Sequence, residues 1–429
     1  MHTRTGLTGD ETRVVQAVDR ALTVNTLTEL MAIPSVGGSS AEVDIQHDLA
    51  ERLAALDLDV QLWPLDLPAL TADPEFPGVE VDRTAAYGLV ATSRGGSSTG
   101  PNGRPALILQ GHVDVVPPGD RAAWCSDPFT PVVSAHEVVG RGACDMKGGV
   151  AAILSAVRAV QEVGLPLSRR FAVHCVVGEE DGGLGAFGTL ADGHDGDACI
   201  IPEPTGLTLV TANAGALTFR IEVPGLATHG STSYAGSSAI DSYLPLHRAL
   251  KDLEQRRNER PESLMTGFPI AYPLSVGTIQ GGDWASTVPD LLVVEGRYGL
   301  RIDEDPAEAR RQLEEVVQES AARDPFLADH RPRISWPGGQ FRGGQLPAGH
   351  GLRDLVRSAH TDASGHQMPP ERGAPYGSDL RLYAGAEIPT LHYGPGDVRL
   401  AHGPNESVPI EELLTASRTL ALSIVRSCG

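Results

Sequence analysis

The stretch "FAVHCVVGEEDGG", residues 171–183, decides the fold, because a short apolar run ends directly on two adjacent carboxylates. An apolar run that does not alternate with polar residues is typical of a strand buried on both faces of a sheet. Glu179 and Glu180 follow at the end of this run. Two neighbouring carboxylates disfavour each other's ionisation, and burial adds to that cost. The sequence therefore predicts a compensating positive charge at this strand end.

Apolar runs alternate with helical patterns on both sides of this stretch. "ALILQ" at 106–110 and "ACII" at 198–201 are further strand candidates, and the apolar residues of 148–164 fall on one helical face. Such alternation is typical of a mainly parallel α/β sheet. We also expect an amphipathic helix over 49–60 and a surface loop over 94–105.

The character of the chain changes near Ala214, where strands surround two helical stretches at 238–256 and 305–323. Helix-and-strand alternation resumes near His350. We therefore expect a smaller α+β domain, of ordinary domain size, inserted into the α/β domain. The expected boundaries are 1–213 and 343–429 for the main domain and 214–342 for the inserted one.

The composition excludes several classes of partner. A chain of 429 residues is too long for one ordinary core, and its formal net charge of −21 argues against nucleic acid and anionic membranes as partners.

Five cysteines, odd in number and without a C-x-x-C pair, suit reduced thiols. The N-terminal stretch lacks the apolar core of a secretory signal, and no run reaches the ~18 apolar residues of a membrane helix. We therefore expect a cytoplasmic location and no membrane partner.

Side chains of the kind that bind metals recur at the ends of the expected strands. Taken singly, each has an ordinary explanation, since a histidine after a strand is often only hydrogen-bonded and an aspartate before a helix is often its N-cap. Their recurrence at successive strand ends indicates one crevice, where an open α/β sheet holds its chemistry. These residues are His112, Asp114, Asp145, Glu179, Glu180, Glu203 and His402.

Two histidines with three or four carboxylates form the ligand set of a pair of divalent cations. Imidazole and carboxylate suit zinc best, with cobalt or manganese as alternatives. Two such ions would supply the positive charge that the neighbouring glutamates require. One glutamate can then bind metal while the other takes a proton from metal-bound water, whose pKa a nearby cation lowers towards ~7.

Six motifs, in chain order, carry a family resemblance: "GHVDVVP", "W-x-x-DPF", "GRGACDMKGG", "GEED", "PEPTG" and "AHGPNESV". With them the chain resembles the two-zinc amidohydrolases and peptidases of the aminoacylase family. That family includes acetylornithine deacetylase, succinyl-diaminopimelate desuccinylase and glutamate carboxypeptidases. The resemblance runs from about Glu29 to the C-terminus and implies amide hydrolysis at two zinc ions.

The resemblance also implies a role for each strand-end residue. Glu179 would be the general base, and Asp114 would orient the imidazole of His112. The implied metal ligands are His112 and Glu203 for one zinc, Glu180 and His402 for the other, and Asp145 as the bridge between them.

The inserted domain resembles the family's lid and dimerisation domain, which implies a homodimer. "GLATHGSTSYAG" matches the lid-histidine motif, so His229 would reach the partner subunit's active site and stabilise the oxyanion. Arg301 matches a lid arginine that binds the substrate carboxylate, with Arg297 as its rival, and Arg381 in "YGSDLR" is a further candidate for anion binding. The chain departs from the family at "STVP", where Ser286 replaces an asparagine that holds substrate.

The motifs "PEPTGL" and "HYGPGDVRLAHGPNE" favour the deacetylase and desuccinylase branch, and hence a small N-acyl amino acid or related N-acyl amine as substrate. A dipeptidase or carboxypeptidase is the alternative, because the same attack by water cleaves either amide. A non-catalytic binding protein on this fold is a third hypothesis, although no expected ligand or base is missing. The lone G-x-G-x-x-G at 183–188 follows three acidic residues, which disfavours a dinucleotide site. No G-x-S-x-G motif supports covalent acyl transfer.

Overall fold

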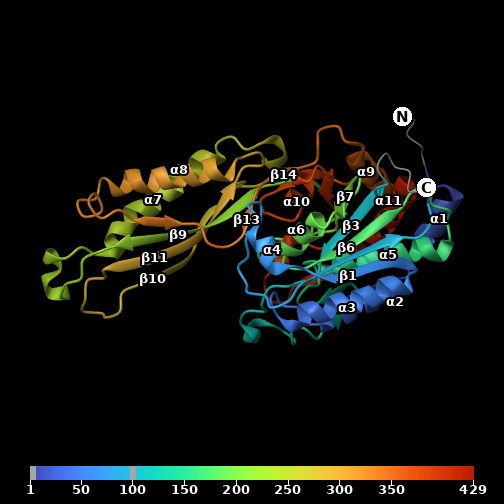
Figure 1. Ribbon diagram of the computed structural model, residues 1–429, viewed down its shortest axis with the longest axis horizontal. Coiled ribbons are helices and arrows are strands. Elements are labelled where there is room, and N and C mark those ends of the chain that lie inside the picture. Colours follow the sequence, from blue (N-terminus) through green and yellow to red (C-terminus); the bar gives the residue numbers. More distant parts are fainter. Residues whose placement is uncertain (1–5, 97–102) are drawn as a thin grey trace. The chain divides into compact units, whose positions relative to one another are not determined.

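The computed structural model describes residues 6–96 and 103–429 and has an α/β architecture (Figure 1). The chain forms two compact units. The first unit combines the chain up to Thr211 with Gln345–Arg372 and Asp379–Gly429. The second consists of Ala212–Gly344 and the short segment Gly373–Ser378. The boundaries expected from the sequence do not include this return of the chain to the second unit.

A nine-stranded mixed sheet forms the centre of the first unit. Its four central strands, β6, β3, β7 and β16, run parallel, whereas β2 and β8 join this centre antiparallel at its two sides. The parallel sheet predicted from the sequence is therefore the middle of a larger mixed sheet. In sheet order the strands are β1 (Leu58–Pro64), β2 (Tyr87–Ser93), β6 (Phe171–Val176), β3 (Leu107–His112), β7 (Cys199–Ile201), β16 (Thr390–His392), β8 (Leu209–Asn213) and β14 (Gly344–Gln345), with β15 (Glu371–Ala374) paired to β8.

Helices cover both faces of this sheet. Successive residues of a strand point to opposite faces, so each face presents its own set of side chains to the helices on it. Leu107 and Leu109 of β3 pack with α2, α3, α5 and α11, whereas Ile108 between them packs with α6 and α10. The long helix α5 (Lys147–Val163) is buried over most of its length. The other helices of the unit are α1 (Gly9–Gln16), α2 (Arg20–Ala32), α3 (Ser40–Ala55), α4 (Leu67–Ala72), α6 (Leu184–Ala191), α9 (Gly351–Ala363), α10 (Leu380–Gly385) and α11 (Ile410–Cys428), with 3₁₀ turns at Arg121–Ala123 and Val398–Leu400.

A separate three-stranded sheet in the first unit joins two loops that are far apart in sequence. It consists of β4 (Val132–Val133), β5 (Glu137–Val139) and β17 (Ser407–Pro409), with β5 in the middle. Because β17 pairs antiparallel with β5, the loop that leads into β17 lies beside the loop that leaves β5.

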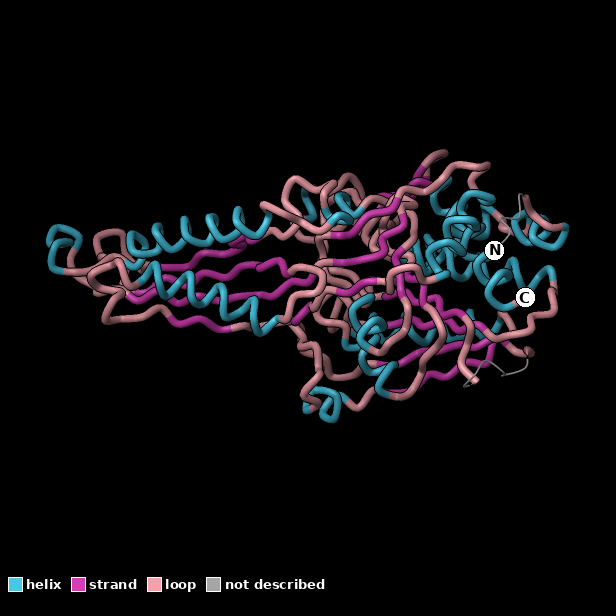
Figure 2. The backbone as a smooth tube through the Cα atoms, turned by 90° about the horizontal axis from the view of Figure 1, so that it is seen from above, coloured by secondary structure: helices cyan, strands magenta, loops and turns pink. Residues whose placement is uncertain are grey.

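The second unit is a five-stranded antiparallel sheet with two helices along it (Figure 2). Every second residue of β9, from Leu217 to Val223, is buried against the helices α7 and α8, as the period of a strand requires. The elements are β9 (Gly215–Pro224), β10 (Leu274–Gly281), β11 (Leu291–Leu300), β12 (Arg333–Ser335), β13 (Gln340–Phe341), α7 (Ala239–Asn258) and α8 (Pro306–Ala321), with 3₁₀ turns at Gly230–Ala235 and Ser263–Met265.

The helix expected over 49–60 is wrong in its second half. Helix α3 ends at Ala55, and β1 begins at Leu58. Asp57 between them adopts a left-handed backbone with φ of 57°, which cannot continue an α-helix. Of the loop expected over 94–105, residues 97–102 lie outside the described residues. No helix in the described parts of the chain combines the length and apolar character needed to cross a membrane.

Candidate metal centre

Two groups of acidic and imidazole side chains in the first unit, here called the donor groups, share one aspartate. The first is His112, Asp145 and Glu203, the second is Asp145, Glu180 and His402, and the possible ligand atoms of each group lie within 4.8 Å of one another. His112 Nε2 is 3.2 Å from Asp145 Oδ1, and His402 Nε2 is 3.2 Å from Asp145 Oδ2. Asp145 thus presents one oxygen to each group, as a carboxylate that bridges two ions would.

The elements that deliver these side chains explain why they meet. His112 ends β3, Glu180 follows β6 and Glu203 follows β7, and these three parallel strands end at the same edge of the sheet. Asp145 lies in the loop between β5 and α5, and His402 in the loop before β17, so the pairing of β17 with β5 brings both loops to this edge. The five residues expected as ligands therefore all lie in one cluster.

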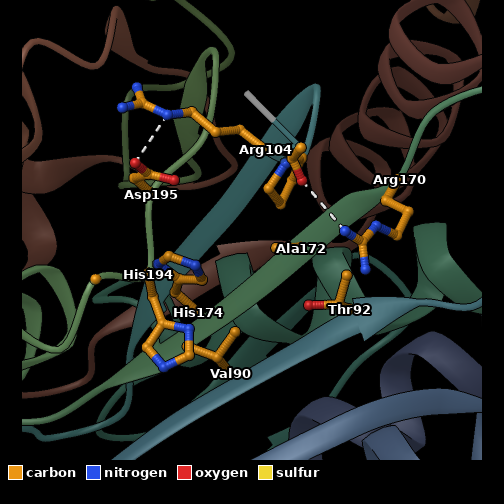
Figure 3. A pocket seen from close by; sticks show the side chains of 11 residues that line it. Val90, Thr92, Arg104, Arg170, Ala172, His174, His194 and Asp195 are labelled. Carbon is orange, nitrogen blue, oxygen red and sulfur yellow. Dashed lines mark hydrogen bonds and ion pairs between the residues drawn. The ribbon is translucent and has the colours of Figure 1, made fainter. Parts of the chain in front are cut away.

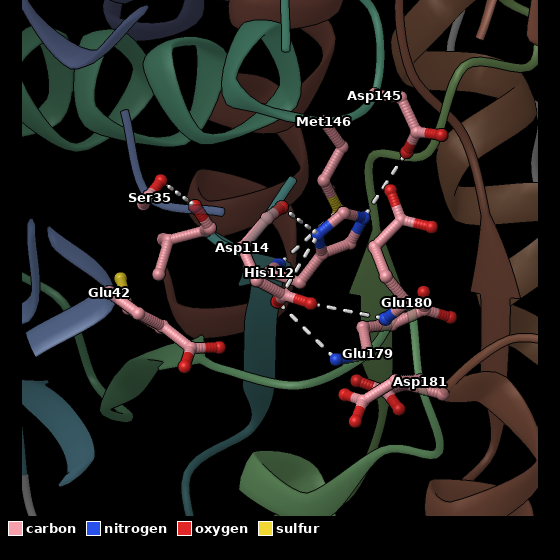
Figure 4. A network of polar contacts seen from close by, with 12 residues as sticks. Ser35, Glu42, His112, Asp114, Asp145, Met146, Glu179, Glu180 and Asp181 are labelled. Atoms are coloured by element: carbon pink, nitrogen blue, oxygen red, sulfur yellow. Dashed lines mark hydrogen bonds and ion pairs between the residues drawn. The ribbon is translucent and has the colours of Figure 1, made fainter. Parts of the chain in front are cut away.

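Asp114, which is fully buried, supports the cluster in two ways. Its backbone carbonyl lies 3.0 Å from His112 Nδ1, which fixes the ring with Nε2 towards Asp145. Its carboxylate accepts hydrogen bonds from the backbone N–H groups of Glu179, at 3.3 Å, and Glu180, at 3.1 Å (Figure 4). The expected contact between this carboxylate and the imidazole is longer, with 3.6 Å between Oδ1 and Nδ1. Asp114 therefore orients the histidine and also holds the main chain of both glutamates.

A buried ion pair that sequence reasoning missed holds the loop of Asp145. The Glu406 carboxylate accepts hydrogen bonds from three backbone N–H groups of this loop, that of Asp145 among them at 2.9 Å. Arg141 Nη1 donates to Glu406 at 2.7 Å, and its Nη2 donates to the backbone carbonyl of His402 at 3.2 Å. Both residues stand inside the quoted motifs, and a charged side chain in a glycine-rich motif is the signal that could have found Arg141.

Close main-chain packing holds the segment of Glu203. A Cβ atom at Gly149 would lie 2.2 Å from the carbonyl oxygen of Pro202, and one at Gly394 would lie 2.6 Å from the carbonyl oxygen of Glu203. These distances are too short for any side chain, so both positions require glycine. The first turn of α5 and the chain after β16 therefore press directly on the residue that carries this carboxylate.

Burial and mutual repulsion dominate the electrostatics of the cluster. Burial, with a smaller contribution from the charge of Asp145, raises the pKa of Glu180 to about 7. Burial also raises the pKa of Glu203 to about 8. The charge of His112 opposes this shift in part, and the charge of Asp145 adds to it. Hydrogen bonds that His402 donates to the carboxylates of Asp145 and Glu180 raise the pKa of His402 to about 11. The carboxylates thus carry more negative charge than the imidazoles can balance.

This donor set fits a pair of divalent cations. Imidazole nitrogen and carboxylate oxygen are ligands of zinc, cobalt and manganese. Divalent charge would stabilise the ionised forms of Glu180 and Glu203, which burial disfavours. The side chain of His402 is 55% exposed, so the second group is open to solvent. Access from solvent is what a catalytic metal site needs for its substrate, whereas structural metal sites are closed.

The first unit also contains a cavity of about 200 Å³, which lies where β3 and β6 begin, at the opposite edge of the sheet from this cluster (Figure 3). Arg104 and Asp195 form an ion pair of 2.8 Å at its side. His174 lines it, with Nδ1 in a hydrogen bond of 2.9 Å with the Tyr383 hydroxyl, and burial lowers the pKa of His174 to about 3. The side chains described around this cavity include no group that could hold a metal ion.

Two further predicted residues lie together in the second unit. The N–H of Gly230, next to His229, donates to the Ser286 carbonyl at 2.5 Å. His229 Nδ1 accepts the N–H of Ser231 at 3.1 Å. Because one ring nitrogen of a neutral imidazole accepts and the other donates, His229 carries its proton on Nε2.

The two rival arginines of the second unit differ in their surroundings. Arg301 Nη2 donates to the Arg257 carbonyl at 2.9 Å, and its guanidinium lies 5.8 Å from the centre of the Tyr272 ring. Arg297 Nη2 donates to the Pro375 carbonyl at 3.0 Å. Burial lowers the pKa of Arg297 to about 10, with no offset from an acidic group among the described residues.

Arg381, expected as an anion-binding residue, lies in the first unit and is buried. Its Nη2 donates to the Gly182 carbonyl at 2.6 Å. The guanidinium therefore supports the main chain directly after the two glutamates.

Comparisons with known proteins bear on the family and the fold of the chain. The sequence profile of Peptidase family M20/M25/M40 matches residues 108–426. The chain is 32% identical over 350 residues to acetylornithine deacetylase of Myxococcus xanthus, covering 80% of this chain and 84% of that protein. It is 28% identical over 350 residues to N-formyl-4-amino-5-aminomethyl-2-methylpyrimidine deformylase of Bacillus subtilis, covering 76% and 80%. Its fold is similar to that of a dinuclear metal-binding peptidase of family M20 from Bacillus subtilis, with a TM-score of 0.60, 16% identity and coverage of 95% and 98%. The family resemblance predicted from the motifs is confirmed.

We expect each donor group to bind one divalent ion, so that removal of single ligands lowers the metal content in a defined pattern. Glu203→Gln should leave only the second group able to bind tightly, whereas Asp145→Asn should weaken both groups because its carboxylate is common to them. Metal content after dialysis, measured by plasma mass spectrometry, tests this. The exposed Glu411, paired with Arg20, provides the control Glu411→Gln. Equal metal content in Asp145→Asn and the unaltered protein would contradict the shared ligand.

Proposed function

The chain belongs to peptidase family M20/M25/M40 and is a metal-dependent hydrolase of amide C–N bonds, and we propose that it removes a small acyl group from an N-acyl amino acid or related N-acyl amine. The observation that carries this proposal is the pair of donor groups that share Asp145. Glu179 lies in the same turn as the ligand Glu180 but belongs to neither group. Amide hydrolysis needs an activated water, a polarised carbonyl and a base, and these residues offer a means for each.

We assign the metal as zinc, with cobalt or manganese as alternatives of the same ligand chemistry. Two such ions would activate a water molecule and polarise the carbonyl of the scissile amide. The residues that would hold them are His112 and Glu203 on one side, Glu180 and His402 on the other, and Asp145 between them.

Glu179 is the proposed general base. Its side chain is buried, and burial raises its pKa well above the ordinary value, an effect that His112 opposes and that neighbouring acidic groups such as Glu203 strengthen. A carboxylate with a raised pKa accepts a proton more readily near neutral pH. The hydrogen bond from its N–H to Asp114 fixes the main chain beneath it. Glu179 would take the proton from the attacking water and later deliver it to the nitrogen of the leaving amine.

His229 is the proposed donor to the oxyanion. Its ring is exposed in the second unit, and the contact of Nδ1 with Ser231 leaves the Nε2–H free to donate. We propose that it acts in the active site of the partner subunit of a homodimer formed through the second unit. The edge strand β10 supports such a dimer, since most of its side chains are exposed, including Ile279 at 55%. Ser286, which lies beside His229, would contact the same substrate.

The two similar enzymes support a small acyl group, since one is a deformylase and the other a deacetylase. Dipeptidase or carboxypeptidase activity is the alternative, because the same groups would cleave a peptide bond. Free thiols at the described cysteines agree with the proposed cytoplasmic location.

Arg297 is the better candidate for binding a substrate carboxylate. Its guanidinium is partly buried, and no acidic group among the described residues offsets the lowered pKa, so a substrate anion would relieve the cost of burial. Arg301 instead uses its guanidinium within the second unit, at the Arg257 carbonyl and the Tyr272 ring. Arg381, held at Gly182, would act on the substrate only through the turn that it supports.

Release of free amine from N-formyl, N-acetyl and N-succinyl amino acids and from dipeptides, measured with zinc- or cobalt-loaded protein, tests the function. We expect turnover of at least one N-acyl amino acid, and a loss of at least about 100-fold in kcat in Glu179→Gln, because the proton transfer is removed. The Glu411→Gln variant is the control. Turnover of dipeptides alone would establish the alternative, and full activity of Glu179→Gln would contradict the assigned base.

For the best carboxylate substrate of that panel, Arg297→Met should raise KM by about 10- to 100-fold with little change in kcat, because a charge-assisted hydrogen bond to the substrate is lost. Arg301→Met is the matched control and should change KM by less than about threefold. The corresponding substrate amide, which lacks the carboxylate, should be insensitive to Arg297→Met. A large effect of Arg301→Met alone would reverse the assignment.

A further inference from the structure

The turn that carries the two glutamates contains a third carboxylate, which the proposed reaction does not use. Residues 178–183, here called the glutamate turn, contain Glu179, Glu180 and Asp181. Asp181 is buried and belongs to neither donor group. A buried carboxylate is stable only with a partner of opposite charge or with several hydrogen bonds.

Arg83 is that partner, and it comes from the proline-rich segment before β2. Its Nη1 and Nη2 donate to the two carboxylate oxygens of Asp181, each at 2.8 Å. Its Nε and Nη2 donate to the two carboxylate oxygens of Glu42 in α3, at 2.8 and 3.0 Å. The side chains of Arg83 and Glu42 are each 2% exposed, and that of Asp181 is 6% exposed. One guanidinium thus makes two bidentate contacts away from solvent.

The segment of Arg83 also packs directly on the glutamate turn. The N–H groups of Glu80 and Val81 donate to Asp181 Oδ2 at 3.2 and 3.0 Å. A Cβ atom at Gly182 would lie 2.0 Å from the carbonyl oxygen of Gly78, so the two main chains touch. The turn is therefore clamped from this side by charge, by main-chain hydrogen bonds and by packing.

Glu42 extends this clamp to the segment after β3 that carries Asp114. The Glu42 carboxylate accepts the N–H of Gly38 at 3.1 Å, and the neighbouring N–H of Gly37 donates to the carbonyl of Val115 at 3.2 Å. Asp114, one residue before Val115, holds the glutamate turn from its other side. Arg83 consequently closes a ring of contacts that surrounds the turn (Figure 4 shows its Glu42, Asp114 and Asp181 members).

We propose that Arg83 is a positioning residue of the amide hydrolysis: by holding Asp181 it fixes the glutamate turn, and so fixes Glu179 for proton transfer and Glu180 at the second donor group. This inference rests on the proposed function, since it assumes the roles given to the two glutamates. Arg83 belongs to neither donor group and acts on the turn through Asp181, with Glu42 as its second partner.

Arg83→Met tests the proposal, because it removes the charge and the donors but keeps much of the side chain's length. We expect kcat to fall by about 10- to 100-fold with KM changed by less than about threefold, as for other residues that orient a catalytic or ligating group. We also expect weaker metal binding at the group of Glu180, by about 10- to 100-fold in a chelator competition without substrate.

Arg426→Met is the matched control. Arg426 also binds two carboxylates in the first unit, Glu11 at 2.7 Å and Asp362 at 2.5 Å, but contacts no residue of the donor groups. Both variants should lower the melting temperature, whereas only Arg83→Met should lower kcat and metal affinity. Arg83→Lys should recover part of the loss, because one ammonium can still reach one carboxylate.

A purely structural role would give a different pattern. Wild-type kcat and metal affinity in Arg83→Met, or equal losses in Arg426→Met, would overturn the proposal. If Arg83→Met does not fold, Asp181→Asn replaces it, and the double variant Arg83→Lys/Asp181→Asn should lose no more kcat than the worse single variant. Additive losses would show that Arg83 does not act through Asp181. The metal competition needs no turnover, so a failure of the proposed substrate class leaves this test intact.

Discussion

The mutual repulsion of buried carboxylates is the constraint on which the first unit depends. Glu180 and Glu203 each have a carboxylate oxygen within 4.8 Å of Asp145, and burial raises the pKa of both glutamates. Without a source of positive charge, such a cluster would protonate or move apart. Divalent cations supply that charge most compactly, and the same cations give the cluster its chemistry. The requirement for metal and the capacity for amide hydrolysis thus have one physical origin.

The fold holds these like charges together through the main chain. Asp114 and Glu406 each accept backbone N–H groups, and so fix the turn of Glu180 and the loop of Asp145. Both anchors are themselves carboxylates, which adds to the negative charge of the region. Two arginines supply positive charge to this region. Arg141 pairs with Glu406, and Arg83 pairs with Asp181 on the same turn as Glu180. The donor groups are therefore the centre of a larger network of buried charges.

The donor set could be predicted from local patterns, because His112, Glu180 and Glu203 follow parallel strands whose ends meet at one edge of the sheet. The residues that hold these side chains in place could not be predicted in this way. Arg83 is 98 residues from Asp181, and Glu406 is 261 residues from Asp145, so no local pattern joins them. The direction of the Arg381 guanidinium likewise depends on how α10 packs, and a sequence does not contain that. For the same reason the helical pattern of 49–60 does not reveal that Leu58–Val60 pair with β2 as the start of a strand.

The central claim is that Asp145 joins two metal sites in one cluster. Anomalous X-ray diffraction from zinc-loaded crystals tests it most directly, since it locates each ion independently of activity. The account predicts two peaks, one in the group of His112 and Glu203 and one in the group of Glu180 and His402, with an oxygen of Asp145 about 2.0–2.2 Å from each. A single peak, or peaks that Asp145 does not join, would contradict it.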